Sequence, residues 1–247
     1  NMAVGYNNID VEAATRLGIA VSNTPGVLSD TTADLAFALL MAVARRIPEA
    51  ERFLRTGKFT GWGPLLFCGA DVHHATLGLI GAGRIGRLVA RRALGFDMTI
   101  LYHNTTRMAL EDEALYHMRY VSFEEVLQQS DFISLHVPYT SSTHHLIGER
   151  ELHLMKPAAF LINTARGPVV DEKALVKALQ DGVIAGAGLD VFENEPAVEP
   201  ALLQMENVVL LPHIASASLQ TRTRMATMAC ANIVAHSSGQ RPPNILN

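Results

Sequence analysis

The chain has 247 residues, of which 49% are hydrophobic and 18% are charged, and its formal net charge at pH 7 is −4. Such a chain can bury a full core in one large or two smaller domains, and it has neither a basic cluster typical of nucleic-acid binding nor an apolar run long enough to cross a membrane. Its two cysteines, Cys68 and Cys230, form no disulfide or metal-binding pattern, so we expect a cytoplasmic protein without a metal.

The first quarter of the chain is predicted to contain two helices, a short strand and a turn. The expected elements are a helix over residues 8–17, a strand over 19–22, a turn over 23–26 and a long helix over 31–46 capped by Ser29. The long helix has almost no polar face, which predicts burial between domains or between subunits. Residues 57–69 contain Trp62 and other apolar groups without a regular period, which indicates an arm that packs on a partner.

From Thr76 onward, short apolar runs alternate with amphipathic segments. The predicted strands cover residues 77–80, 98–102, 132–137, 160–164, 186–191 and 208–211. The predicted helices cover residues 85–94, 123–129, 149–155, 171–180, 201–204 and 218–239. Strands that are apolar throughout are covered on both faces, so the pattern predicts an α/β fold with a doubly wound, Rossmann-type parallel sheet. In such a sheet, ligands bind at the carboxyl ends of the strands.

The first of these strands ends in the pattern Gly81-x-Gly83-x-x-Gly86, and a helix begins inside the pattern. In a dinucleotide site, Gly81 would let the chain turn, Gly83 would let backbone amides approach a pyrophosphate, and Gly86 would let the helix pack on the strand. Arg84 and Ile85 would complete this loop. The alternative is that the three glycines serve ordinary turns, but the strand before them and the helix after them favour a dinucleotide.

The end of the next strand, residues 102–107, indicates which dinucleotide binds. An NAD site usually carries Asp or Glu at this position, and this segment contains neither. Asn104 stands where the acid would be, and Arg107 follows closely enough to reach a 2′-phosphate. The pattern therefore favours NADP, with NAD still possible. The alternative is that Arg107 is a solvated loop residue.

Later strand ends carry Arg166, Glu195 and His213. These residue types suit the reduction of a carbonyl group. An arginine can hold a carboxylate and a carbonyl oxygen, a histidine can donate a proton near neutral pH, and a carboxylate can orient that histidine. His136 is a competing imidazole, but it follows the strand beside the adenosine half, so we expect it to line the cofactor.

Taken in order and spacing, these motifs resemble the signature series of the D-isomer-specific 2-hydroxyacid dehydrogenases. The resemblance is carried by Gly81-x-Gly83-Arg84-Ile85-Gly86, His136-x-Pro138, Asn163-Thr164-Ala165-Arg166-Gly167, Leu189-Asp190-Val191-Phe192 with Glu195-Pro196, and Pro212-His213-Ile214-x-Ser216. Within the family the chain is most similar to the glyoxylate/hydroxypyruvate reductase group, both in the acid-free second strand end and in the arm around Trp62.

The resemblance implies a role for each site residue. Arg166 would bind the substrate's carboxylate and keto oxygens, His213 would protonate the carbonyl oxygen, and Glu195 would pair with His213. The implied cofactor contacts, besides the glycine loop, Asn104 and Arg107, are His136, Pro138, Thr164 and Asp190, the last holding the nicotinamide carboxamide. The implied substrate contacts, besides Arg166 and His213, are Val4, Gly5, Ser216 and, from the neighbouring subunit, Trp62.

The resemblance also implies two domains. Residues 25–214 would form the dinucleotide-binding domain with a dimerisation helix and arm, and residues 1–24 and 215–247 would be remnants of a flavodoxin-like substrate domain, because family members begin several dozen residues earlier. The expected protein is a homodimeric oxidoreductase that reduces glyoxylate or hydroxypyruvate to the D-2-hydroxy acid with NADPH. Two alternatives stay open: an NAD-linked dehydrogenase of another 2-hydroxy acid, and a cofactor-sensing, corepressor-like binding protein on the same fold.

Overall fold

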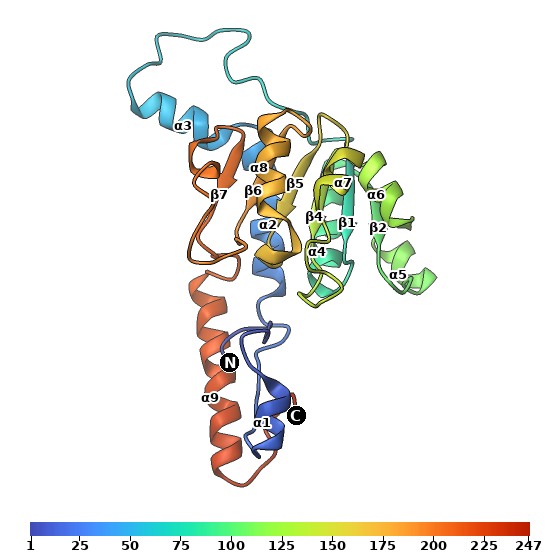
Figure 1. Cartoon of the computed structure of the whole chain (residues 1–247), viewed down its shortest axis with the longest axis vertical. Coiled ribbons are helices and arrows are strands. Elements are labelled where there is room, and N and C mark those ends of the chain that lie inside the picture. Colours follow the sequence, from blue (N-terminus) through green and yellow to red (C-terminus); the bar gives the residue numbers. More distant parts are fainter. The chain divides into compact units, whose positions relative to one another are not determined.

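A computed structural model describes all 247 residues, which fall into two compact units (Figure 1). The larger unit is Ala33–Ala215, and the smaller unit combines Asn1–Thr32 with Ser216–Asn247. The first unit boundary follows Thr32 and not residue 24 as expected, and the second follows Ala215, one residue beyond the expected 214. No helix is both long and apolar enough to span a membrane.

The larger unit is built on a seven-stranded sheet in which every neighbouring pair of strands is parallel. Its strands are β1 (Thr76–Ile80), β2 (Thr99–His103), β3 (Met118–Tyr120), β4 (Phe132–Leu135), β5 (Phe160–Asn163), β6 (Gly186–Leu189) and β7 (Val208–Leu210). The strand order is β3-β2-β1-β4-β5-β6-β7, so the winding direction changes between β1 and β4. The predicted doubly wound parallel sheet is confirmed, and ligands bind such sheets beside this change of direction.

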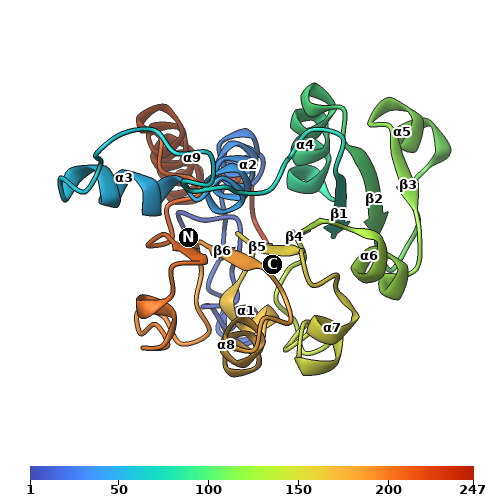
Figure 2. The same ribbon diagram turned by 90° about the horizontal axis from the view of Figure 1, so that it is seen from above.

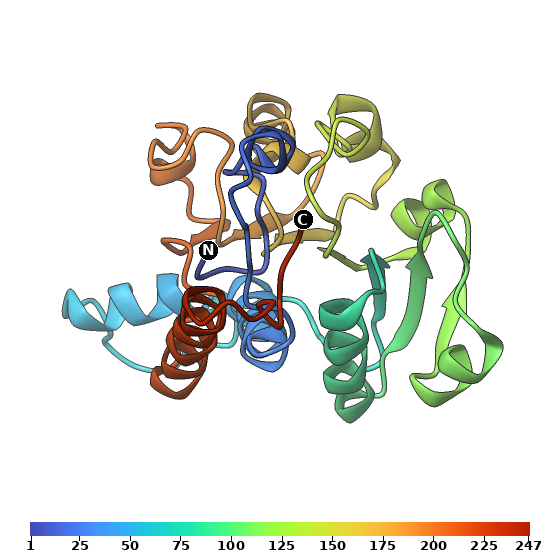
Figure 3. The same ribbon diagram turned by 90° about the horizontal axis from the view of Figure 1, so that it is seen from below.

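Helices cover both faces of this sheet (Figures 2 and 3). The helices of the whole chain, of which α1 and α9 belong to the smaller unit, are α1 (Val11–Arg16), α2 (Ser29–Ala44), α3 (Ile47–Arg55), α4 (Arg84–Ala93), α5 (Leu110–Leu115), α6 (Phe123–Gln129), α7 (Glu149–Leu154), α8 (Glu172–Gln180) and α9 (Leu219–Ser237). Helices α2 and α4 share one hydrophobic core with the sheet, and α6, α7 and α8 share the other. Alternate side chains of β1 enter the two cores: Leu77 and Leu79 face α2 and α4, and Ile80 faces the opposite layer.

Several predicted elements differ from the observed ones. The edge strand β3 was not predicted, because the exposed Arg119 interrupts an apolar run of only three residues. Helices α3 and α5 were not predicted either, and the helix expected over 201–204 is a short 3-10 turn, Leu202–Gln204. Other local signals were correct: Ser122 and Glu125 form the expected capping box at the start of α6.

The long apolar helix α2 packs against the sheet of the larger unit. Leu39, Leu40 and Val43 belong to the same core cluster as Leu77 of β1 and Ile162 of β5. The sheet therefore accounts for the burial that the sequence assigned to a boundary between domains or subunits. Helix α2 also begins at Ser29 itself instead of being capped by it.

Beyond α2, the exposed helix α3 has no buried residue, and it leads into the irregular segment over 56–69. Trp62 and Leu65 of this segment are 85% and 84% exposed. The prediction of an irregular, apolar segment here is confirmed. Its packing on a partner stays a prediction.

The smaller unit is held together by contacts between its two chain segments. The Thr31 and Thr221 hydroxyls are 2.6 Å apart, and the buried Asn232 donates to the Asn23 carbonyl oxygen over 3.4 Å. The strand expected over 19–22 is absent, because only Ser22 forms a bridge, with Ile245. A single bridge cannot extend into a ladder where no second strand lies beside it.

Candidate active site

In the loop between β1 and α4, close backbone contacts require glycine at two of the three positions. Gly81 has φ +95°, and a Cβ there would lie 2.7 Å from the carbonyl carbon of His136. A Cβ on Gly86 would lie 2.5 Å from the Gly81 carbonyl oxygen, whereas the space around Gly83 is open. Gly83 caps α4 without any side-chain hydrogen bond, so the first amides of α4 are left for an anion. This geometry supports the predicted pyrophosphate site, and the contacts of Arg84 and Ile85 stay predictions.

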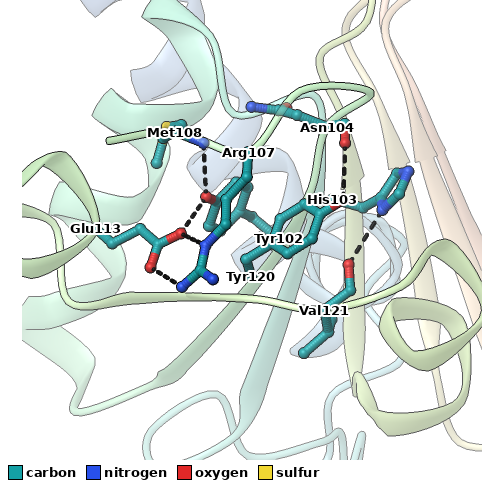
Figure 4. A network of polar contacts seen from close by, with 8 residues as sticks. All are labelled: Tyr102, His103, Asn104, Arg107, Met108, Glu113, Tyr120 and Val121. Carbon is teal, nitrogen blue, oxygen red and sulfur yellow. Dashed lines mark hydrogen bonds and ion pairs between the residues drawn. The ribbon is translucent and has the colours of Figure 1, made fainter. Parts of the chain in front are cut away.

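The end of β2 lies beside the glycine loop, and the two are joined by a side chain. The Asn104 Oδ1 accepts a hydrogen bond from the Ala82 amide over 2.7 Å. Arg107 forms a two-pronged ion pair with Glu113 of α5, with distances of 2.7 Å from Nε and 2.8 Å from Nη2 (Figure 4). Arg107 is thus paired with a carboxylate, but its side chain is 53% exposed, so its contact with a 2′-phosphate stays a prediction beside the alternative of a solvated loop residue. The residue at position 104 is an asparagine, so this strand end lacks the carboxylate that an NAD site usually has there.

His136 and Thr164 follow β4 and β5. The His136 Nε2 lies 2.9 Å from the Ser134 Oγ, and removal from water lowers the His136 pKa to about 4. A neutral imidazole of this kind cannot supply a proton near neutral pH, which supports the lining role over a catalytic one. The Thr164 hydroxyl is buried and has no partner within the chain. Such an orphaned hydroxyl fits a missing ligand, as the predicted cofactor contact requires.

The predicted catalytic pair forms in the structure. The His213 Nδ1 lies 2.9 Å from the Glu195 Oε2, and both side chains are partly exposed. The other oxygen of Glu195 accepts a hydrogen bond from the Phe192 amide over 3.1 Å, which fixes the carboxylate. Because Glu195 engages Nδ1, Nε2 is the ring nitrogen of His213 that can hand a proton to a substrate.

Arg166 follows β5 and lies close to this pair. Burial lowers the pKa of the Arg166 guanidinium, and the nearby Glu195 carboxylate acts in the opposite direction. The side chain of the buried Asn163 stabilises the turn that follows β5. Its Oδ1 accepts a hydrogen bond from the Ala165 amide and its Nδ2 donates to the Arg166 carbonyl oxygen, each over 3.0 Å. Asn163 thus fixes the backbone turn before Arg166, a contact that the sequence motif did not reveal.

Gly167 brings the loop that carries Arg166 into backbone contact with the loop that carries Glu195. A Cβ on Gly167 would lie 1.8 Å from the Phe192 carbonyl oxygen and 2.4 Å from the Glu193 amide nitrogen. Only glycine permits this approach. Arg166 and Glu195 are therefore neighbours because Gly167 has no side chain, a requirement that the sequence motif did not reveal.

Asp190, at the end of β6, is completely buried and supports the turn that carries His213. Its two oxygens accept hydrogen bonds from the amides of Ile214 over 2.7 Å and Ala215 over 2.8 Å. Burial raises the pKa of the Asp190 carboxyl, and these amides act in the opposite direction. Each carboxylate oxygen can accept a further hydrogen bond, so the predicted nicotinamide contact stays open as a prediction.

For the remaining predicted site residues, the structure shows chiefly the unit to which each one belongs. Val4, Gly5 and Ser216 belong to the smaller unit, and Pro138 and Trp62 belong to the larger unit. Trp62 is highly exposed. The substrate contacts of Val4, Gly5, Ser216 and Trp62, and the cofactor contact of Pro138, stay predictions.

Comparison with known proteins identifies the family. The family model described as D-isomer specific 2-hydroxyacid dehydrogenase, NAD binding domain, matches residues 37–215, which is well over half of the chain. The chain belongs to this family. The predicted family, the Rossmann-type fold and the enzyme class, an NAD(P)-dependent oxidoreductase, are therefore confirmed.

Individual relatives of this dehydrogenase are highly similar in sequence and structure. It is 56% identical over 249 residues to a glyoxylate reductase of Thermococcus litoralis, covering 99% of this chain and 75% of that protein. A glyoxylate reductase of Korarchaeum cryptofilum is 57% identical over 247 residues, covering 99% and 74%. The solved NADPH-dependent glyoxylate/hydroxypyruvate reductase of Sinorhizobium meliloti, in complex with NADP and malonate, is 42% identical with a TM-score of 0.92, covering 100% and 76%.

Proposed function

We propose that this 2-hydroxyacid dehydrogenase reduces a small 2-keto acid, glyoxylate or hydroxypyruvate, to the D-2-hydroxy acid with NADPH. The observation that carries the proposal is the His213–Glu195 pair, 2.9 Å apart and within electrostatic reach of Arg166. The names of the similar relatives support the substrate class, because they are glyoxylate or glyoxylate/hydroxypyruvate reductases.

The residues of the chain fit a nicotinamide dinucleotide. The uncapped start of α4 and the open space at Gly83 suit a pyrophosphate, and the orphaned Thr164 hydroxyl suits a ligand donor or acceptor near the sheet. Asp190 and His136 would contact the same ligand, since they follow β6 and β4, which end at the same edge of the sheet with only β5 between them. When bound, the reduced cofactor supplies the hydride that the carbonyl carbon of the substrate accepts.

The chain's own residues supply the rest of the chemistry. Arg166 holds the substrate's carboxylate and keto oxygens through its guanidinium donors. The Nε2 of His213 gives its proton to the carbonyl oxygen, while Glu195 keeps the imidazole oriented through Nδ1. The Arg166 guanidinium and the Nε2 proton of His213 both stabilise the negative charge that develops on that oxygen as the carbonyl is reduced. This charge exists only in the transition state.

Selection of NADPH over NADH is assigned to the end of β2. The segment lacks the carboxylate that would repel a 2′-phosphate, and Arg107 supplies a fixed positive charge there. The relative from Sinorhizobium meliloti, solved with NADP, supports this choice. An NAD-linked enzyme acting on another 2-hydroxy acid is the alternative, and comparable kcat/KM values with the two cofactors would favour it.

We also propose a cytoplasmic homodimer. The arm over residues 56–69 exposes Trp62 and Leu65 almost completely, and a soluble fold rarely leaves such side chains uncovered without a partner surface. The smaller unit would be the part of the substrate domain that this chain contains, with Val4 and Gly5 gripping the substrate carboxylate. Both cysteines are free and exposed, which suits a reducing compartment.

An initial-rate panel tests the proposed reaction. The full-length protein is assayed with NADPH and with NADH against glyoxylate, hydroxypyruvate, pyruvate and 2-ketogluconate. We expect NADPH oxidation with glyoxylate or hydroxypyruvate at the highest kcat/KM. Cofactor binding without turnover of any of the four acids would instead favour a cofactor-sensing binding protein.

A further inference from the structure

The ribose end of the site contains a buried carboxylate that the proposed chemistry does not use. Glu113 lies on α5, its side chain is only 10% exposed, and both of its oxygens contact Arg107. The hydroxyl of the fully buried Tyr102 donates over 2.6 Å to Oε1 of Glu113, the oxygen that also accepts from Nε of Arg107. Figure 4 shows the Glu113 carboxylate facing both the tyrosine hydroxyl and the guanidinium. The carboxylate is therefore held by two residues, Tyr102 and Arg107, and it in turn restrains the arginine.

A second set of contacts fixes Arg107 relative to the glycine loop. The guanidinium carbon lies 5.6 Å from the centre of the Tyr120 ring, and the Tyr120 hydroxyl donates to the Asn104 carbonyl oxygen over 3.3 Å. Asn104 in turn accepts a hydrogen bond from Ala82 in the glycine loop. A continuous series of contacts thus connects the loop assigned to the pyrophosphate with the arginine assigned to the 2′-phosphate.

The ion pair leaves part of the guanidinium available. An arginine has five N–H donors, and the pair with Glu113 engages Nε and one side of Nη2. The hydrogens on Nη1 and the outer hydrogen of Nη2 form a second fork, whose spacing suits two oxygens of one phosphate. The Arg107 side chain is 53% exposed, so a ligand can approach it.

We propose that Glu113 is a specificity-determining positioning residue. It holds Arg107 so that the second fork meets the 2′-phosphate of NADPH, and it thereby sets the preference for NADPH over NADH. The inference rests on the proposed NADPH-dependent function. Its signature is an effect on NADPH alone, because NADH has no 2′-phosphate for Arg107 to bind.

Two effects of Glu113 oppose each other, and the geometry decides between them. The carboxylate repels a phosphate, but it binds the Nε and Nη2 edge of the guanidinium and leaves the adjacent Nη1 and Nη2 edge open, and water at the half-exposed arginine screens the repulsion. The carboxylate also removes the side-chain entropy that an unrestrained arginine would lose on binding. Because the pKa of Glu113 is lowered to about 2, chiefly by its hydrogen bonds with Arg107, the pair stays ionised at any ordinary assay pH. We therefore expect positioning to outweigh repulsion.

The test compares cofactor binding by three variants of the full-length protein. Glu113→Ala removes the contact, Glu113→Gln keeps the shape and one acceptor, and Glu111→Gln removes the same charge from an exposed position of α5. Dissociation constants for NADPH and NADH are measured by fluorescence titration without a keto acid, and circular dichroism verifies the fold. We expect Glu113→Ala to weaken NADPH binding about three- to tenfold, with Glu113→Gln intermediate, NADH within about twofold, and Glu111→Gln like the wild type.

The outcomes separate the inference from the proposed reaction. Tighter NADPH binding by either Glu113 variant, or equal weakening of NADPH and NADH, would overturn the positioning role. A wild type without any preference for NADPH would overturn it as well. If NADPH binding alone weakens in the Glu113 variants but the wild type reduces no keto acid, the inference holds and the proposed reaction fails.

Discussion

Replacing Gly167 with alanine tests how closely the two catalytic loops must approach each other. The new Cβ would lie 1.8 Å from the Phe192 carbonyl oxygen, whereas ordinary contacts begin at 3.4 Å. The loops carrying Arg166 and Glu195 must therefore separate by about 1.6 Å. A misplacement of about 1 Å can cost on the order of a hundredfold in rate, so we expect at least that loss in kcat/KM. Overpacking of this kind also costs about 1–3 kcal/mol of stability.

The assay for this variant separates loop displacement from general unfolding. Initial rates of keto-acid reduction are compared with NADPH dissociation constants and thermal melting of the same preparation. Gly95→Ala is the matched control, because a Cβ there meets nothing within 4 Å and the backbone is unstrained. We expect the control to keep full activity, and Gly167→Ala to bind NADPH while losing rate. A Gly167→Ala variant with wild-type kcat/KM would refute the account of the loop contact.

Three further predictions follow from individual side chains. The Glu113 pKa is about 2 against a usual 4.5, so its stabilisation is complete above about pH 4.5 and is lost as the pH falls towards 2; the difference in melting temperature between wild type and Glu113→Gln should shrink over that range, and a constant difference would contradict the pairing. Asp190→Asn should place an amide N–H₂ against a backbone amide, costing about 1–3 kcal/mol in urea unfolding and lowering kcat through the His213 turn; unchanged stability would show that the two bonds contribute little. Trp62→Ala should leave melting unchanged, since the side chain is 85% exposed, but should raise the dimer dissociation constant in analytical ultracentrifugation; a wild type that sediments as a monomer at micromolar concentration would contradict the arm's role.

Much of the fold could be predicted because its signals are local. Strands covered on both faces must be apolar throughout, which marks runs such as those of β1 and β4 directly in the sequence. Capping residues such as Ser122 mark helix starts for an equally local reason. The parallel order then follows from the alternation of strands and helices. By contrast, β3 is a three-residue edge strand, and its existence depends on pairing with β2.

The site was predictable as a set of residues but not as a set of contacts. The pairing of His213 with Glu195 could be expected from their chemistry at neighbouring strand ends. Gly167 could not be recognised as a spacer, because its contact at Phe192 joins loops 25 residues apart in sequence. The partner of Arg107 was equally hidden, since Glu113 lies on a helix that was not predicted and is too short to show a clear period.

The central claim is that His213 protonates the keto oxygen of a small 2-keto acid during reduction with NADPH. The most direct measurement is kcat for glyoxylate and hydroxypyruvate in the full-length protein and its His213→Gln variant, alongside NADPH binding to both. Loss of a general acid lowers rates about 10²- to 10⁴-fold, so we predict a fall of at least a hundredfold in kcat with NADPH affinity unchanged. A wild type that reduces neither acid, or a variant that retains more than a tenth of the wild-type kcat, would contradict the account.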